Sequence, residues 1–121
     1  MIEYIDAKKA MALMDSEATC IFNIVTAWCG DCTKQAENFN RFASDFIKRG
    51  ISVYEINVQN EPHQYISAEL ETLTRLFGGI GFPRTVLIQN GKVVDADNVE
   101  VISADDLSVL AKKLSNTLHF S

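Results

Sequence analysis

Cys29 and Cys32 are the residues of this sequence with the clearest capacity for chemistry, since only Gly30 and Asp31 separate them. The pair follows an apolar, β-branched run and precedes an amphipathic pattern, so we expect it where a strand gives way to a helix. Unpaired N–H groups and the partial positive charge of a helix N-terminus stabilise a thiolate. We therefore expect Cys29 to be the nucleophile and Cys32 to be the thiol that closes the disulfide.

A metal site is the chemical alternative for this pair. Zinc usually takes four ligands, and the further candidates are Cys20, His63 and His119. Cys20 lies in an apolar run, where a cysteine is more often a small buried hydrophobe, and we expect both histidines at the surface. Redox chemistry is therefore favoured over a metal site. We expect no metal, and no cofactor other than the disulfide of the pair itself.

The elements that must position the pair alternate between strands and helices. The run Cys20–Thr26 is nearly continuously apolar, which suits a central strand covered on both faces. Asn90-Gly91 is a strong hairpin signal, because both residues tolerate positive φ. Strand–helix–strand units give parallel pairs and the hairpin adds an antiparallel one, so we predict an α/β fold with a central mixed β-sheet flanked by helices on both faces. The expected strands are 2–5, 20–26, 51–58, 85–89 and 92–94, and the expected helices begin after Asp6, around Cys32, near Ile66 and after Ser103.

The composition is that of an ordinary globular protein. Of 121 residues, 47% are hydrophobic and 22% are charged, which is enough to bury a core in one domain spanning residues 1–121. The net charge of −5 argues against nucleic acid or an anionic membrane as a partner, because both attract a basic surface. The N-terminus lacks the pattern of a signal peptide, and no run reaches the ~18 apolar residues of a membrane span. We therefore expect a cytoplasmic protein with mostly reduced thiols.

Two segments resemble the thioredoxin family. Residues 26–32, Thr-Ala-Trp-Cys-Gly-Asp-Cys, are similar to the family's Trp-Cys-Gly-Pro-Cys segment, and residues 81–87, followed by Asn90-Gly91, are similar to its cis-proline segment and hairpin. The resemblance covers almost the whole chain and implies a thioredoxin fold. It also implies that Pro83 is cis, that it faces the cysteines, and that the backbone of Phe82 pairs with an extended substrate. The substrate-binding residues under this resemblance are Trp28, Gly30, Asp31, Phe82, Pro83 and Arg84.

The chain departs from the family pattern beside the cysteines. Asp31 stands where thioredoxins usually have proline, and a carboxylate there disfavours a thiolate at Cys29. Arg84, which is unusual after the proline, is expected to face Cys29 and to offset part of this effect.

A second departure concerns proton transfer. Asn23 occupies the position of the family's buried aspartate, and an amide cannot take up a proton. Glu55, at the position of a nearby lysine, is a possible proton acceptor if it points inward, because burial raises the pKa of a carboxyl group. The alternative for Glu55 is a solvated strand residue.

The favoured function is reduction of protein disulfides, in which Cys29 forms a mixed disulfide and Cys32 resolves it. The expected partners are disulfide-bearing protein clients and an electron donor, either a thioredoxin-reductase-type enzyme or glutathione, and we expect a monomer. Two alternatives remain open. One is a thioredoxin-like binding module or assembly subunit with little redox turnover, which Asn23 and Asp31 keep open. The other is a dimer bridged by zinc or an iron–sulfur cluster.

Overall fold

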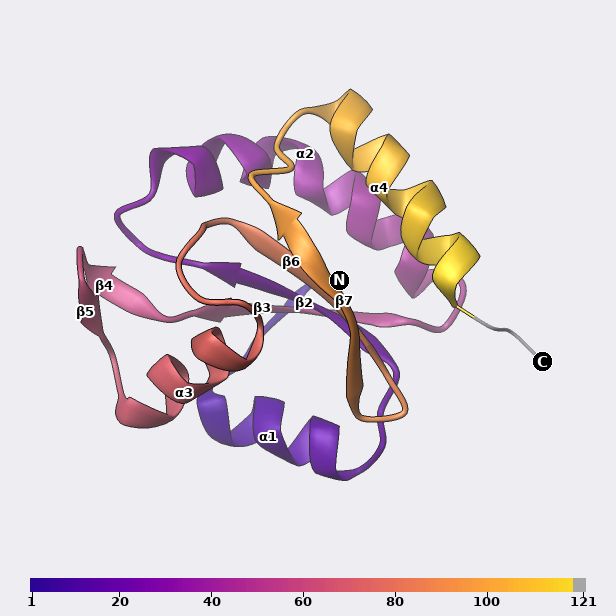
Figure 1. Ribbon diagram of the computed structural model, residues 1–121. Coiled ribbons are helices and arrows are strands. Elements are labelled where there is room, and N and C mark those ends of the chain that lie inside the picture. The colour runs from indigo at the N-terminus through magenta and orange to yellow at the C-terminus, as the bar shows by residue number, and fades with distance from the viewer. Residues whose placement is uncertain (119–121) are drawn as a thin grey trace.

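The computed structural model describes residues 1–118, so His119, one of the candidate metal ligands, lies outside the described residues. Its strands and helices are interspersed along the chain (Figure 1). In chain order they are β1 (Glu3–Tyr4), α1 (Ala7–Asp15), β2 (Cys20–Val25), α2 (Gly30–Ile47), β3 (Ser52–Asn57), β4 (Gln59–Glu61), β5 (Gln64–Tyr65), α3 (Ala68–Leu76), β6 (Arg84–Gln89), β7 (Lys92–Val99) and α4 (Ala104–Thr117).

A mixed sheet in the order β1-β3-β2-β6-β7 forms the centre of the molecule. β1 and β2 pair with β3 in parallel, whereas β6 is antiparallel to both β2 and β7. β2 lies in the middle and every one of its residues is buried. The prediction of an α/β fold with a mixed central sheet is therefore confirmed.

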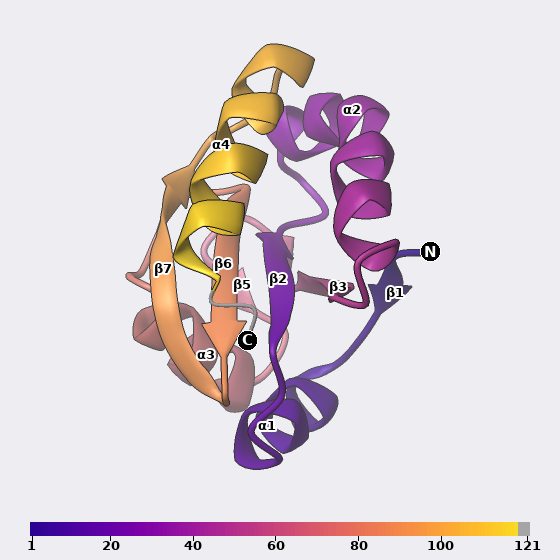
Figure 2. The same ribbon diagram turned by 90° about the vertical axis from the view of Figure 1, so that its right-hand side faces the viewer.

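Helices cover both faces of the sheet, as Figures 1 and 2 show. α2 and α4 pack over one face, where Ile21 and Leu87 contribute to the core. α1 and α3 cover the other, where the core includes Phe22 and Val86. Successive strand residues point to opposite faces, so the uninterrupted apolar run of β2 supplies both cores at once.

The residues that were expected to cap helices and to form the hairpin turn do so. The Asp6 carboxylate accepts a hydrogen bond from the Lys9 N–H at 2.9 Å and caps α1, and Ser103 Oγ caps α4 by accepting from the Asp106 N–H at 3.0 Å. Asn90 and Gly91 both have positive φ, 54° and 79°, in the β6–β7 turn.

Two elements differ from the expectation. A small hairpin, β4–β5, follows β3 directly, although the sequence there has no alternating apolar pattern. β7 continues to Val99, because Thr85 and Arg84 of β6 pair with Asn98 and Val99 across register shifts that disturb the simple alternation. Within the described residues, no helix is long and apolar enough to cross a membrane.

Candidate active site

Cys29 is the N-cap residue of α2, where the chain leaves β2. Its Sγ accepts a hydrogen bond from the backbone N–H of Cys32 at 3.1 Å, so the thiol itself satisfies one of the unpaired donors of the helix end. This contact and the helix dipole both favour negative charge on the sulfur. Cys29 is 8% exposed, the same fraction as Cys32.

Cys32 lies one turn further into α2, and its thiol is in the reduced form. Burial raises the pKa of the Cys32 thiol well above its usual range, and hydrogen bonding to Cys29 and the charge of Glu55 add to the effect. The backbone of Thr26 opposes it in part. Cys32 is therefore held as a neutral thiol at neutral pH and needs a base before it can attack.

The segment before β6 brings a carbonyl group to the Cys29 sulfur. The Phe82–Pro83 peptide bond is cis, as the resemblance implied, and the Cys29 thiol donates to the Phe82 carbonyl oxygen across 3.7 Å. Pro83 is buried, and its own carbonyl oxygen accepts from the Glu100 N–H at 2.8 Å. The expected juxtaposition of this segment with the cysteine pair is thus present.

Trp28 forms an exposed rim next to Cys29, with 44% of its surface accessible. The indole Nε1 donates to Oε1 of Gln59 at 3.1 Å, and its ring meets the Phe82 ring edge-on with centroids 6.5 Å apart. Gln59 opens the β4–β5 hairpin and also accepts from the Ala27 N–H through its carbonyl oxygen at 2.9 Å. The hairpin that the sequence reasoning missed therefore holds the tryptophan. Gly30 is exposed and Asp31 is partly buried on the same helix end.

A buried polar network lies one turn along α2 from Cys32. The Asn23 amide donates to Gln35 Oε1 at 2.8 Å and accepts from Thr85 Oγ1 at 3.1 Å. Gln35 Nε2 donates to the Val101 carbonyl oxygen at 3.0 Å and thereby joins α2 to the segment before α4. Gln35 is only 1% exposed. The sequence reasoning missed it, although the spacing Cys32, Gln35, Phe39 places it on the buried helix face.

Glu55 is the neighbour of Asn23 across the β2–β3 pair and is only partly exposed. Burial raises the pKa of the Glu55 carboxyl group above its ordinary value, while the Asn23 amide offsets part of the effect. Its charge acts on the Cys32 thiol. These surroundings differ from those of a fully solvated strand residue.

Arg84 corrects one sequence expectation. It was expected to face Cys29, but its buried guanidinium donates from Nη1 to the Ala96 carbonyl oxygen at 2.9 Å and from Nη2 to the Ile80 carbonyl oxygen at 3.4 Å. The physical reason is the strand order. β6 lies between β2, which leads to Cys29, and β7, which contains Ala96, and the side chain reaches towards β7.

The remaining candidate metal ligands lie apart from this site. Cys20 is fully buried in β2, and burial raises the pKa of its thiol to about 12. His63 is exposed, in the β4–β5 turn. Among residues 1–118, no group of three or more His, Cys, Asp or Glu side chains is arranged to hold a metal ion.

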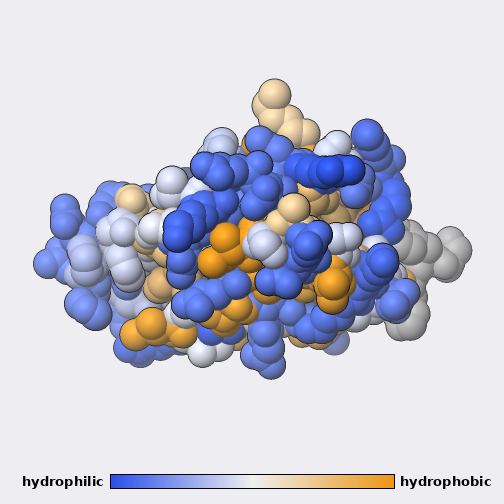
Figure 3. Space-filling view, turned by 90° about the horizontal axis from the view of Figure 1, so that it is seen from above, coloured by the Kyte–Doolittle hydropathy of each residue, from blue (hydrophilic) through white to orange (hydrophobic). Residues whose placement is uncertain are grey.

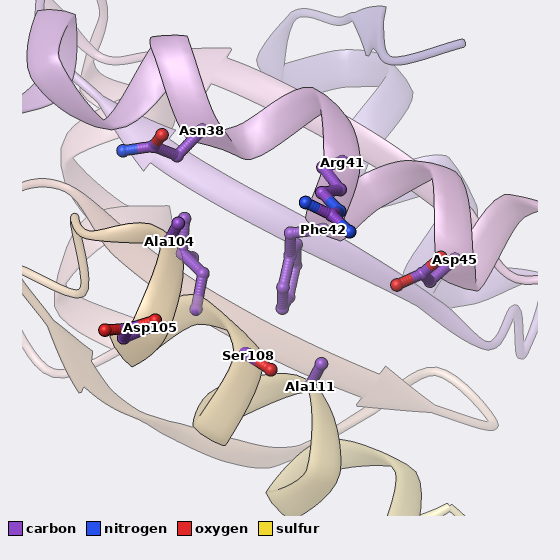
Figure 4. Close-up of a pocket in the computed structure, with 9 residues that line it drawn as sticks. Asn38, Arg41, Phe42, Asp45, Ala104, Asp105, Ser108 and Ala111 are labelled. Atoms are coloured by element: carbon purple, nitrogen blue, oxygen red, sulfur yellow. The ribbon is translucent and has the colours of Figure 1, made fainter.

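The face covered by α2 and α4 is mostly hydrophilic, with small apolar areas between the polar side chains (Figure 3). A groove lies between these two helices, lined on one side by Asn38, Arg41, Phe42 and Asp45 and on the other by Ala104, Asp105, Leu107, Ser108 and Ala111 (Figure 4). Its lining mixes charged, neutral polar and apolar side chains, and none of its residues belongs to the cysteine site.

Comparisons with known proteins agree with this fold. The chain is similar to thioredoxin f2 of Chlamydomonas reinhardtii (13% identity, TM-score 0.68, 94% of this chain and 96% of that one). It is also similar to a thioredoxin f2 solved in a complex with ferredoxin:thioredoxin reductase (13%, 0.68, 97% and 96%). It is similar to oxidised thioredoxin of Plasmodium falciparum (16%, 0.67, 94% and 98%) and to mitochondrial thioredoxin 3 of Saccharomyces cerevisiae (12%, 0.69, 95% and 94%).

These structures establish the thioredoxin fold. No curated protein matches the chain. The model of the AhpC/TSA family matches residues 6–99, a stretch that includes both cysteines and Pro83. The chain therefore belongs to the thioredoxin-like AhpC/TSA family, whose general class of chemistry is that of a thiol–disulfide oxidoreductase.

Proposed function

We propose that this protein is a monomeric, cytoplasmic reductase of protein disulfides that works through Cys29 and Cys32. The observation that carries the proposal is the position of the Cys29 sulfur, which accepts from the Cys32 N–H at 3.1 Å and lies 3.7 Å from the Phe82 carbonyl oxygen. A thiolate there is stabilised by the helix end, and it lies beside a backbone that can hold an extended substrate.

In the first step the Cys29 thiolate attacks one sulfur of the client disulfide. A bond forms between Cys29 Sγ and that sulfur, the client S–S bond breaks, and the second client sulfur leaves as a thiolate that takes a proton from water. The raised pKa of the Cys32 thiol favours this order, because Cys32 stays protonated while Cys29 reacts.

In the second step Cys32 resolves the mixed disulfide. Glu55 is the proposed proton acceptor: its partly buried carboxylate takes the proton of the Cys32 thiol. The Cys32 thiolate then attacks Cys29 Sγ, and the remaining client sulfur leaves and is protonated. Two electrons have moved from the dithiol to the client, and the Cys29–Cys32 disulfide remains.

Client binding is assigned to the rim of the site. Trp28, Gly30 and Asp31 contribute the side formed by β2 and α2, and Phe82 with Pro83 contributes the other. We propose that an extended client segment lies along the backbone of Phe82, which brings its disulfide to Cys29.

The oxidised protein needs an electron donor to return to the dithiol. A thioredoxin-reductase-type enzyme is proposed because one similar protein, thioredoxin f2, has been solved in complex with ferredoxin:thioredoxin reductase. Glutathione is the second candidate. A Cys29–Cys32 reduction potential at or below about −230 mV would fit a disulfide reductase, and one near −180 mV or above would contradict it.

Trapping tests the proposal directly. Cys32→Ser removes the resolving thiol, so mixed disulfides between Cys29 and its clients are expected to accumulate and to disappear on addition of a strong reductant. The matched control is Cys29→Ser/Cys32→Ser, which keeps Cys20. If the Cys32→Ser variant traps no client, and its partners are those of the unmodified protein, the chain is a binding module and the reductase proposal fails.

A further inference from the structure

Arg84 places a charged side chain in a buried position, and removing that charge from water costs free energy. Only 6% of its side-chain surface is exposed, and a guanidinium carries a positive charge. Within residues 1–118, the carboxylate in reach is that of Asp97, at 4.0 Å and almost fully solvated, so the ion pair is weak. The Nε atom has no hydrogen-bond partner. An apolar side chain of similar size would cost less free energy to bury. The stability of the fold alone therefore does not explain why an arginine occupies this position.

The guanidinium fills a turn of the chain that leads to the active site. Nη1 lies 2.7 Å from where a Cβ atom on Gly78 would be, and Nη2 lies 3.2 Å from the corresponding position on Gly81. Nη2 also donates to the Ile80 carbonyl oxygen. The loop of residues 78–81 is therefore closed over the guanidinium, and only glycine leaves room at Gly78.

The same group is anchored to the sheet on its other side. Nη1 donates to the Ala96 carbonyl oxygen in β7 at 2.9 Å, a shorter bond than the one to the loop. Arg84 thus connects the edge strand β7 to the loop that immediately precedes Phe82. Phe82 carries the carbonyl that contacts the Cys29 sulfur and the ring that meets Trp28.

We propose that Arg84 is a positioning residue, whose guanidinium fixes the loop of residues 78–81 onto β7 and thereby holds the Phe82 backbone in place for a protein client. The inference rests on the proposed function for its catalytic consequence, since client segments bind along that backbone. The connection that Arg84 makes between the loop and β7 does not depend on the proposed function, and it is tested separately.

The catalytic test compares a peptide disulfide with hydroxyethyl disulfide, which is too small to use the Phe82 backbone. In Arg84→Met, the rate constant for the peptide is expected to fall about tenfold relative to that for the small disulfide, because misplaced substrate contacts cost rate without changing the thiol. An unchanged ratio, or an equal fall in both rates, would overturn the proposal. In Arg84→Lys the ammonium group can reach one of the two carbonyl groups, so we expect a ratio of the two rate constants between those of Arg84→Met and the unmodified protein. A ratio equal to that of the unmodified protein would show that contacts with both carbonyl groups are not required.

The structural test uses Trp28, the only tryptophan in the chain. Quenching of its emission by acrylamide is expected to increase in Arg84→Met, because the loop that holds the Phe82 ring against the indole is released. If the unmodified protein reduces no peptide disulfide but this increase occurs, the proposed function fails and the positioning role of Arg84 stands. If quenching stays the same, the positioning role fails whatever the activity.

Two glycine substitutions provide a matched pair. Gly78→Ala and Gly79→Ala both place a side chain at positive φ, 120° and 92°, so both carry backbone strain. Only Gly78→Ala would displace the guanidinium, because the Cβ position on Gly79 has nothing within 4 Å. We expect Gly78→Ala to reproduce the change in rate ratio and quenching of Arg84→Met, and Gly79→Ala to leave both close to those of the unmodified protein. Equal effects of the two would overturn the assignment to Arg84.

Discussion

The sulfur of Cys29 lies 3.7 Å from the carbonyl oxygen of Phe82, although 53 residues separate the two in the sequence. Cys29 follows the end of β2 and Phe82 precedes the start of β6, and these strands are antiparallel neighbours in the sheet. The topology therefore brings the nucleophile and the proposed client-binding backbone to the same edge. Under the proposed function, a client segment that pairs with the Phe82 backbone would lie beside Cys29.

The Cys29 thiol is expected to react with iodoacetamide before the thiols of Cys32 and Cys20. Burial raises the pKa of Cys20 to about 12 and raises that of Cys32 well above the usual range, so little thiolate is present at either residue near pH 8. Mass spectrometry of the reduced native protein after timed alkylation measures the order. Modification of Cys32 before Cys29 would contradict the assignment of the nucleophile, and denatured protein, in which all three should react, is the control.

Much of this site follows from local sequence, because a turn, a cap and a helix start are decided by neighbouring residues. The place of Cys29 and Cys32 at the start of α2 was expected from the pattern, and the cis bond before Pro83 from the resemblance to thioredoxins; both are present. Arg84 was placed wrongly, because the direction of a long side chain depends on which carbonyl groups lie unpaired nearby. Those of Ile80 and Ala96 become neighbours only once β6 and β7 pair.

The role of the β4–β5 hairpin could also not be predicted from the sequence. Gln59 is buried because its side chain accepts from the Trp28 indole and its carbonyl oxygen accepts from the Ala27 N–H. An alternating apolar pattern does not predict β4, because polar contacts hold this strand to Trp28, 31 residues earlier in the chain.

Glu55→Gln is expected to slow the resolving step at least tenfold, because the amide cannot accept the proton of the Cys32 thiol. Attack by Cys29 should be unaffected, so the mixed disulfide should become visible in rapid-quench experiments. In the unmodified protein the resolving rate should rise with pH as the Glu55 carboxyl group ionises, and this rise should be lost in the variant. Glu3→Gln, which changes an exposed carboxylate on β1, is the control. Unchanged resolution in Glu55→Gln would remove Glu55 from the mechanism.

Glu55 also predicts how stability depends on pH. Burial raises the pKa of its carboxyl group above the ordinary value of 4.5, so the folded state binds this proton more tightly than the unfolded state does. The free energy of unfolding contributed by this group therefore falls as pH rises from about 4.5 through the raised pKa. Urea unfolding of the unmodified protein and of Glu55→Gln at pH 4 and pH 8 measures this. The unmodified protein should lose stability relative to the variant at the higher pH, and a gap that stays constant would show that the carboxyl group is not buried.

Gln35→Leu is expected to lower the free energy of unfolding by about 1–3 kcal/mol, despite adding an apolar residue to the core. The reason is that the Asn23 amide and the Val101 carbonyl oxygen would each lose a buried hydrogen-bond partner. Lys34→Leu, at an exposed position of the same helix, should change stability far less. If Gln35→Leu were neutral or stabilising, the network would not link α2 to the segment before α4.

Gly91→Ala is expected to destabilise the fold more than Gly50→Ala does. Both glycines have positive φ, 79° and 83°, so both substitutions cost about 1 kcal/mol or more in backbone strain. A Cβ atom on Gly91 would additionally collide with the Met14 carbonyl oxygen and approach the Glu17 Cα atom at 3.1 Å, whereas the Cβ position on Gly50 has nothing within 4 Å. Backbone atoms cannot move aside cheaply, so the difference in unfolding free energy between the two variants measures the contact of the β6–β7 turn with the end of α1. Equal losses would mean that the backbone at this contact moves aside at little cost in free energy.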